Sequence, residues 1–547
     1  MPINTPISVY PVKLTQVSQT GHKVLFDESH CGYGSAAFVP GNASLFAWIL
    51  EEYGYETDTN FDQQIGASIL TGVDILVLYF PVVALTSAEV TAVQNFVQAG
   101  GGLLLVGTDN NPTYQYSSSN LNAISQAYGV TFSTSNSWLG KTEEIGTHHI
   151  TQDVSSIHSN LDYKLSGATL SLESPAISVV TFNDDPVVAV SEAGSGKVVC
   201  VGALAPFVMY RVQKQWQTEK DDLFQFTLNI ADWLVGNSPR KVVVPDVAVI
   251  PVGSGPSLTP TEVEGYRSYT GIIHDHTTHS DGSDTPEDML WSGLSRGLDY
   301  MVMTDHSYET PNPIGLGGIT GGLAMRGIAE SRGLDIEIFA GAELSRGPHA
   351  MAFPLTQNIY TEIQAEKIAG AHAQGAIISL CHPTISAAYR GSYESFDADG
   401  YDAIEVICDG FYHGLWDEVY TRPFYGASDG HSFEDVGAIV NVVFVDHTTG
   451  LDGRLADHDV ADAILERRLV IVDKTSNIIY GQQVWLDRYF ELMSQAEADI
   501  AAAEGVLGSA DNNKTTLAEL YLEDAEIAYT YGSHQRAIYA VGNATSP

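Results

Sequence analysis

Histidines and carboxylates follow short apolar segments at several places in the second half of the chain. Apolar residues 270–273 lead into His274 and His276, which are two residues apart, so a β-strand would direct both side chains to one face. Two imidazoles on one face can bind a single divalent ion. Four later apolar segments (300–304, 336–342, 377–381 and 424–428) are followed by the same types of residue. Together with His349, which precedes the apolar residues 350–353, these segments mark nine candidate metal ligands: His274, His276, Asp281, His306, Glu343, His349, His382, Asp429 and His431.

This donor set suits divalent ions that assist hydrolysis. Imidazoles and carboxylates are common ligands of zinc, manganese and iron, and these ions need no thiolate. A single histidine is more often a core or surface residue, but the whole set predicts a site for two to three divalent ions. With three ions against Asp281, Glu343 and Asp429, the pocket would be positive by about three charges, so it would attract an anion and lower the pKa of water. The activated water would be the nucleophile, and no serine or cysteine is required.

Two further residues are candidates for direct roles in catalysis. Arg346 follows Glu343 closely, and its guanidinium could hold a phosphate oxygen, although an arginine on the surface would look the same in the sequence. His431 could protonate the leaving group, and a water bound to the metals could do so as well.

The elements expected to position these residues form two α/β segments. Strands at 23–26, 74–80, 103–106 and 196–202 alternate with helices that begin near residues 44, 86 and 223, which predicts a doubly wound, flavodoxin-like parallel sheet over residues 21–236. Residues 1–20 are a polar lead-in, and the proline-rich residues 237–268 form a linker. The second α/β segment covers 269–475. Residues 476–547 are predicted to form a helical hairpin, with helices at 484–504 and 517–541.

The order of five motifs resembles the polymerase and histidinol phosphatase (PHP) superfamily, and the segment is similar to its carbaryl-hydrolase-like branch. The motifs are H-x-H-T-x-x-S-D-G from residue 274, T-D-H from 304, G-x-E from 341, H-P from 382 and S-D-x-H from 428. The resemblance implies a distorted (β/α)7 barrel with a trinuclear metal site, at the carboxyl ends of its strands as in other barrels. It implies three ligand sets: His274, His276, Glu343 and Asp429; Glu343, His349 and His382; and Asp281, His306 and His431.

The first α/β segment resembles the class I glutamine amidotransferase-like fold. The resemblance rests on residues 100–109 (GGGLLLVGTD) and on 229–234 (NIADWL). Members with amidotransferase activity carry a cysteine nucleophile on the turn after the strand, but this turn reads Gly107-Thr-Asp-Asn110. Because this turn lacks the cysteine, we expect the domain to bind a partner or to act as a scaffold rather than to transfer ammonia. Cys31 is the alternative candidate for a nucleophile.

Charge and hydropathy restrict the partners of the protein. The 67 acidic residues outnumber the 25 basic ones and give a net charge of -42, which disfavours duplex nucleic acid and anionic membranes. No apolar run is long enough for a transmembrane helix, so we expect no membrane insertion. No signal peptide is visible. The chain is compatible with a secreted protein whose signal has been removed, which we favour, or with a cytoplasmic protein of a high-salt organism. The tail helices could support a homo-oligomer.

Three hypotheses on function remain open. In the first, the protein is a phosphoesterase that acts on a small anionic substrate. In the second, the same metals support hydrolysis of a carbamate, a carboxylic ester or an amide. In the third, the protein is a non-catalytic surface or scaffold protein with a structural metal site. The large donor set disfavours the third hypothesis, since structural sites usually close with four ligands.

Overall fold

The architecture is that of a mixed α/β protein with C-terminal helices. The computed structural model describes residues 20–27, 29–30, 44–60, 63–79, 83–108, 117–159, 166–203, 207, 216–242, 248–308, 312–345, 349–382, 400–408, 411–412, 423–475, 477–507 and 515–545. The chain forms two compact units, and the main division between them lies between residues 246 and 247.

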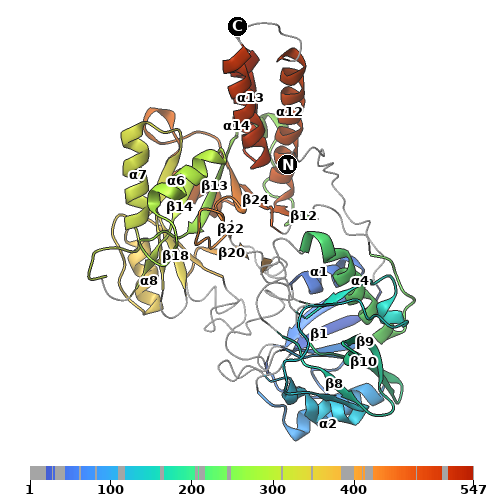
Figure 1. Ribbon diagram of the computed structural model, residues 1–547. Coiled ribbons are helices and arrows are strands. Elements are labelled where there is room, and N and C mark those ends of the chain that lie inside the picture. Colours follow the sequence, from blue (N-terminus) through green and yellow to red (C-terminus); the bar gives the residue numbers. More distant parts are fainter. Residues whose placement is uncertain are drawn as a thin grey trace. The chain divides into compact units, whose positions relative to one another are not determined.

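The first unit is built on a sheet with the strand order β2-β1-β3-β4-β11-β10-β9 (Figure 1). The strands are β1 (Lys23–Asp27), β2 (Glu56–Asn60), β3 (Ile75–Tyr79), β4 (Gly102–Val106), β9 (Ile177–Phe182), β10 (Asp185–Ala193) and β11 (Gly196–Val201). The first five strands in this order are mutually parallel, whereas β10 is antiparallel to both of its neighbours. Every residue of β3 and β4 is buried, as the unbroken apolar runs predict for parallel strands that are covered on both faces.

Helices cover both faces of this sheet. They are α1 (Ser44–Glu52), α2 (Ser87–Gln98), α3 (Asn122–Ser125) and α4 (Trp216–Val235). Helices α1 and α4 lie on one face and α2 on the other (Figure 1). Thr86 and Glu89 form the capping box expected at the start of α2. Short strands complete the unit: β5 (Val130–Phe132), β6 (Lys141–Thr142), β7 (Ile157–His158) and β8 (Leu170–Leu172).

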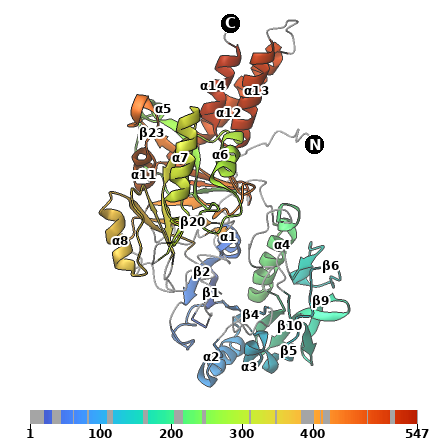
Figure 2. The ribbon, with the colours of Figure 1, turned by 60° about the vertical axis from the view of Figure 1, so that its left-hand side comes forward.

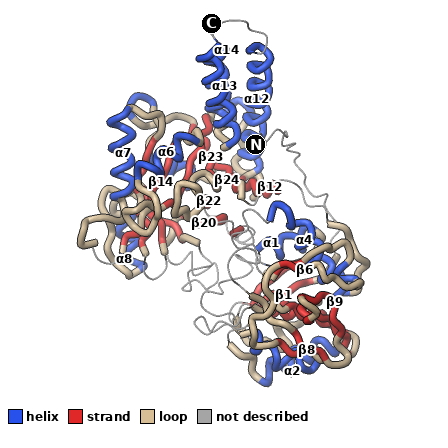
Figure 3. Tube along the Cα trace, viewed as in Figure 1, coloured by secondary structure: helices blue, strands red, loops and turns tan. Residues whose placement is uncertain are grey.

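The second unit contains two sheets (Figure 3). One has the order β12-β25-β24-β23-β13-β14-β16, from β12 (Ala248–Pro251), β13 (Arg267–Asp275), β14 (Tyr300–Met303), β16 (Glu337–Ala340), β23 (Ile439–Val445), β24 (Leu469–Asp473) and β25 (Ile478–Gly481). The other has the order β15-β17-β18-β19-β20, from β15 (His306–Ser307), β17 (Ala342–Leu344), β18 (Ala350–Phe353), β19 (Ile377–Leu380) and β20 (Ala403–Cys408); β22 (Phe424–Ala427) pairs with β20.

The two sheets of the second unit are connected. The chain passes from β14 to β15 and from β16 to β17 within a few residues, and a parallel bridge joins Asp275 at the end of β13 to Gly430 after β22. The helices are α5 (Pro260–Glu264), α6 (Pro286–Ser295), α7 (Thr320–Arg332), α8 (Gln364–His372) and α11 (Asp457–Leu465). Helices α6 and α7 pack side by side (Figure 2). β12 lies within the predicted linker and β25 lies beyond residue 475, yet both belong to a sheet of this unit, because β25 pairs with β24 and β12 pairs with β25.

The described part of the tail contains three helices rather than the predicted hairpin of two: α12 (Gln483–Leu507), α13 (Thr515–Thr530) and α14 (His534–Thr545). The chain turns at Gly532, whose φ of 84° is left-handed. Thr270 Oγ1 donates to the carbonyl of Gly532, and Ser533 Oγ donates to the carbonyl of Gly297, so contacts with the sheet hold the turn. The prediction failed because the apolar spacing continues through this turn.

The first tail helix is part of the core of the second unit. Trp485, Leu486, Tyr489 and Leu492 are buried in one cluster with Val440 and other residues of the sheet. A smaller, alanine-rich cluster holds the tail helices together. None of the described helices combines the length and the apolar character that crossing a membrane requires.

Candidate metal centre

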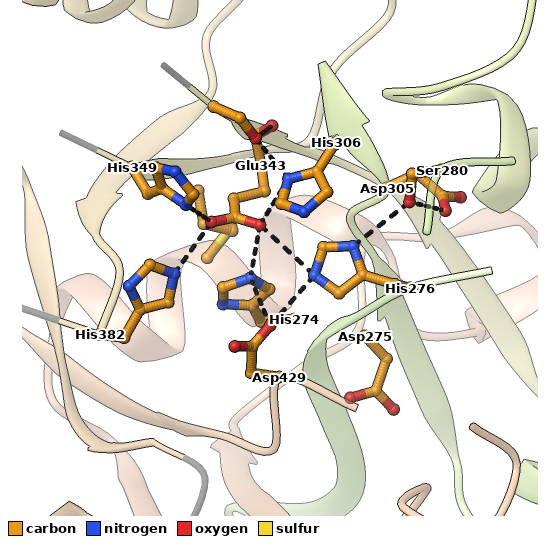
Figure 4. A network of polar contacts seen from close by, with 12 residues as sticks. His274, Asp275, His276, Ser280, Asp305, His306, Glu343, His349, His382 and Asp429 are labelled. Carbon is orange, nitrogen blue, oxygen red and sulfur yellow. Dashed lines mark hydrogen bonds and ion pairs between the residues drawn. The ribbon is translucent and has the colours of Figure 1, made fainter. Parts of the chain in front are cut away.

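The structure brings the nine candidate ligands together, in strands or in loops next to strands. Figure 4 shows the part of this cluster around Glu343. His274 is in β13, and His276 follows that strand by one residue. His306 lies in β15 directly opposite Glu343 in β17. The others lie in loops next to strands: Asp281 after β13, His349 before β18, His382 after β19, and Asp429 and His431 after β22. Arg346 lies outside the described residues.

The nine side chains form three overlapping groups whose ligand atoms lie within 4.8 Å of one another. The groups are His274, His276, Glu343 and Asp429; Glu343, His349 and His382; and His276, Asp281, His306 and His431. These groups match the three ligand sets implied by the resemblance, except that His276 also belongs to the third. That the nine side chains bind metal stays a prediction.

Glu343 is the centre of this arrangement. Its Oε2 lies 3.3 Å from His274 Nε2, 3.4 Å from His276 Nε2 and 2.9 Å from His306 Nδ1. Its Oε1 lies 3.0 Å from His382 Nε2 and also contacts His349 Nδ1. A carboxylate that faces five imidazoles can bridge ions in neighbouring groups.

Three of the candidate ligands have a left-handed backbone, which is uncommon for residues other than glycine. The φ angles are 70° at His274, 26° at His382 and 49° at Asp429. At His274 the pairing of β13 with β14 also shifts register. The regular strand that we expected through His274 and His276 is therefore interrupted, although both side chains do face Glu343. Such strain tends to occur at functional sites, where the surrounding structure holds it.

The orientation of His274 provides a test of whether a cation fits. Its Nδ1 lies 2.5 Å from Glu405 Oε1, and because a carboxylate only accepts, Nδ1 carries the proton. The opposite ring atom, Nε2, and the facing Glu343 Oε2 are both buried without a hydrogen-bond partner among the described residues. A lone pair and a carboxylate oxygen 3.3 Å apart repel each other unless a cation or a proton lies between them. The donor set therefore fits a divalent ion at this position.

The acid–base properties of the site agree with this fit. Burial lowers the pKa of His306, but Asp281 and Glu343 outweigh burial and raise it to about 10. Burial also lowers the pKa of His431, and Asp281 and Asp429 raise it to about 9. Without a cation, the carboxylates thus hold protons on these histidines. Because metal ligands must be deprotonated, a bound divalent ion would displace those protons.

Solvent reaches the site from the side of the third group. The side chains of Asp281, His431 and His349 are 48%, 37% and 33% exposed, whereas Glu343 is 1% exposed. A substrate would therefore meet Asp281 and His431 first. The aromatic ring of Tyr308 is 41% exposed and its centre lies 5.6 Å from that of His306, so it borders the open side.

Buried acids behind the ligands were not predicted from the sequence. Asp305 accepts from the backbone N–H of Thr277 and from Ser280 Oγ, which also lies 3.4 Å from His276 Nδ1 (Figure 4). Asp275 accepts from Ser428 Oγ at 2.7 Å and from the Gly430 N–H, on either side of Asp429.

The third unpredicted acid is Glu405, the partner of His274. Its one signal in the sequence is a charged residue within the apolar strand AIEVIC. A buried acid in such a strand normally has a partner.

No protein-family model and no curated protein matches this chain. Among solved structures, the mmIFT52 N-terminal domain is 17% identical and covers 40% of this chain and 100% of its own, with a TM-score of 0.32. A two-domain protein from Bacteroides vulgatus ATCC 8482, described as containing a predicted PHP-like metal-dependent phosphoesterase, is 20% identical over 40% of this chain and 67% of its own, with a TM-score of 0.31.

A third solved structure is a putative metal-dependent phosphoesterase from Bifidobacterium adolescentis ATCC 15703. It is 18% identical and covers 36% of this chain and 94% of its own, with a TM-score of 0.25. At these TM-scores the similarities do not define the fold of this chain.

Proposed function

We propose that this protein is a metal-dependent hydrolase that acts on phosphate esters. One observation carries the proposal: three groups of histidines and carboxylates meet at Glu343, and the buried Nε2 of His274 and Oε2 of Glu343 face each other without hydrogen-bond partners among the described residues. Two to three divalent ions would be bound by the three groups. Zinc, manganese and iron fit the imidazole and carboxylate donors. When bound, these ions supply Lewis acidity and lower the pKa of water.

Different residues of the chain would bind the ions and donate a proton. Glu343, His274 and His382 are deeply buried and would hold ions away from solvent. His431 Nδ1 donates to the carbonyl of Asp429 at 2.7 Å, so Nε2 faces Asp281 on the exposed side. In this position, Nε2 would be a ligand of a third ion, or would donate a proton to the leaving group where that ion is not bound.

The charge of the site favours an anionic substrate. Two to three divalent ions would exceed the charge of the three candidate carboxylate ligands, while the chain as a whole carries a net charge of -42. A phosphate ester is therefore attracted to the pocket and repelled elsewhere. We propose that Arg346 holds a phosphate oxygen. The alternative substrate is a carbamate, carboxylic ester or amide with an aromatic group, and the exposed ring of Tyr308 beside His306 is the observation that favours it.

We further propose finer assignments for the fold and for the partners. The second unit would be a distorted (β/α)7 barrel of the PHP superfamily, supported by the motif order. The first unit would be a flavodoxin-like, amidotransferase-like domain, supported by its strand order, with a binding or scaffold role. The tail helices would support a homo-oligomer, with Leu520 and Tyr539 among their exposed side chains, and the protein would be secreted.

The test combines metal analysis of the purified protein with hydrolysis of p-nitrophenyl phosphate and p-nitrophenyl acetate in added manganese or zinc. We expect two to three equivalents of metal per protein chain. We also expect His276→Ala to reduce phosphate release by at least about 100-fold, because loss of a residue that only supports a metal ligand already lowers activity by up to about 100-fold. His458→Ala, which removes a 61% exposed histidine of the same unit, is the matched control.

The other outcomes distinguish the alternatives. Cleavage of the acetate ester alone would replace the phosphoesterase with the second hypothesis. Less than one equivalent of metal and no cleavage of either substrate would reject the hydrolase and favour a scaffold protein.

A further inference from the structure

One fully buried carboxylate contacts ligands of two different groups in the candidate metal centre. Glu405 in β20 is 0% exposed. Its Oε1 accepts from His274 Nδ1 at 2.5 Å and from the hydroxyl of Tyr425 at 2.9 Å, while its Oε2 accepts from the backbone N–H of His382 at 2.6 Å. The two oxygens of the carboxylate therefore accept from all three donors.

The contact with His274 determines which ring nitrogen is available for metal. With the proton held on Nδ1, the lone pair is on Nε2, which lies 3.3 Å from Glu343 Oε2 and 3.6 Å from Asp429 Oδ1. A carboxylate behind a histidine in this way fixes the tautomer and the ring orientation and increases the basicity of the ligand. Glu405 thus prepares His274 as a member of the first group.

The contact with His382 acts through the backbone. His382 has a φ of 26°, a strained conformation, and its N–H is held by Glu405 Oε2. In this conformation the ring reaches Glu343, with 3.0 Å between His382 Nε2 and Glu343 Oε1. Without the acceptor, the buried N–H would have no partner and the conformation would lose its support.

The third group is held by other contacts. Ser280 Oγ lies beside His276 Nδ1, the hydroxyl of Ser345 contacts His306 Nδ1, and the carbonyl of Asp429 accepts from His431 Nδ1. Glu405 makes none of the hydrogen bonds found among the described residues of this group. A change at Glu405 should therefore affect the first two groups and spare the third.

We propose that Glu405 is a positioning residue that sets His274 and His382 for the two inner ions, while the outer ion at His276, Asp281, His306 and His431 does not depend on it, because other residues hold these side chains. This inference rests on the proposed function only in requiring that the protein binds divalent ions. It adds that ion binding at two of the three sites requires Glu405, a residue outside the three ligand groups around Glu343.

The experiment is equilibrium titration of the metal-free protein with cobalt(II), followed by its visible absorption and by competition with a chelator. Neither readout depends on turnover. We expect Glu405→Gln to lower the affinity for two of the ions by about 10- to 100-fold, which is the range for loss of a carboxylate behind a metal ligand. The affinity for the third ion should stay unchanged. The absorption of the affected ions should also shift, because the orientation and basicity of His274 change.

Asp459→Asn is the matched control. Asp459 is also buried, with 5% exposure, and also accepts three hydrogen bonds, from Thr449 N–H, Thr449 Oγ1 and Ala456 N–H. Its replacement should lower stability and leave all three affinities unchanged. Tyr425→Phe is the second variant if Glu405→Gln does not fold, because it removes one hydrogen bond to Glu405 and keeps the ring. It should lower the affinity for the same two ions by a few-fold.

Each outcome is decisive. If the wild-type protein binds no ion, the proposed function fails. If the wild-type protein binds ions and Glu405→Gln binds all of them with the same affinity, the positioning role is rejected. Equal weakening of all the ions, or the same effect from Asp459→Asn, would also reject it, since the effect would then be structural. For Tyr425→Phe, unchanged affinities would contradict the proposal.

Discussion

Among the residues that the structure describes, a cluster of histidines and carboxylates in the first unit can be compared with the candidate metal centre of the second. In the first unit, the β1 cluster consists of Asp27, Ser29, His30, Asn60 and Glu89. Asp27 accepts from His30 Nδ1 at 2.8 Å, from Ser29 Oγ at 2.7 Å and from Asn60 Nδ2 at 2.8 Å. His30 Nε2 lies 3.2 Å from Glu89, and Glu89 also caps α2. Both ring nitrogens of His30 therefore face a carboxylate.

The candidate metal centre uses the same residue types with a different result. In this centre, the buried Nε2 of His274 and Oε2 of Glu343 lack hydrogen-bond partners among the described residues. Three of its members have a left-handed backbone, whereas His30, Asn60 and Glu89 do not. Residue types alone thus do not define a metal site. Unpaired lone pairs and backbone strain separate it from a structural network.

Metal binding should affect the two units to very different extents. At a free manganese concentration of 100 times the dissociation constant, one site should stabilise the second unit by about 2.7 kcal/mol and leave the first unchanged. Pulse proteolysis in urea, with the fragments of the two units resolved by mass, measures both free energies of unfolding. A chelator should reverse the effect. Equal stabilisation of both units would remove the distinction between the clusters.

The β1 cluster should respond to pH instead of metal. Burial lowers the pKa of His30, but Asp27 and Glu89 outweigh burial and raise it above its ordinary value. Protonated His30 therefore stabilises the folded first unit at pH values below about 6.5, which is the pKa of a histidine in the unfolded chain. This stabilisation is lost as the pH rises through the higher pKa that His30 has in the folded protein. The first unit should lose up to about 1.4 kcal/mol per pH unit in that window. His30→Gln should abolish this dependence, and a dependence that survived it would have another origin.

The smallest expected effects come from replacing one serine in each cluster, and these two serines allow the closest comparison of the clusters. Ser29 and Ser280 are both partly buried, and each donates to an acid at 2.7 Å. Ser29→Ala should destabilise the first unit by about 1 kcal/mol and leave metal binding unchanged. Ser280→Ala removes the hydroxyl between Asp305 and His276, so it should weaken metal binding by up to about 10-fold. Cobalt titration and pulse proteolysis of both variants check the prediction, and identical behaviour of the two would contradict it.

Local patterns were sufficient for several features. The unbroken apolar runs predicted the buried strands β3 and β4, because such runs are covered on both faces. Thr86 and Glu89 predicted the start of α2, since a capping box forms within four residues. The motif spacing also named the nine side chains that the structure brings together.

Other features depend on residues that are far apart in the chain. Glu405 is 131 residues from His274, and its part in the site exists only because β20 and β13 bring the two together. The left-handed φ of His274 replaces the regular strand that its spacing predicted. The break at Gly532 depends on Thr270 and Ser533, which make tertiary hydrogen bonds across the turn.

The sequence by itself determined the types of ligand, their order and most of the strands that carry them, because hydrophobic periodicity and capping act over a few residues. Only the tertiary structure decided which ligands share a group, which buried atoms stay unpaired and which acids lie behind the histidines. Those properties depend on distances between segments that strand pairing and core packing set, and no local pattern encodes them.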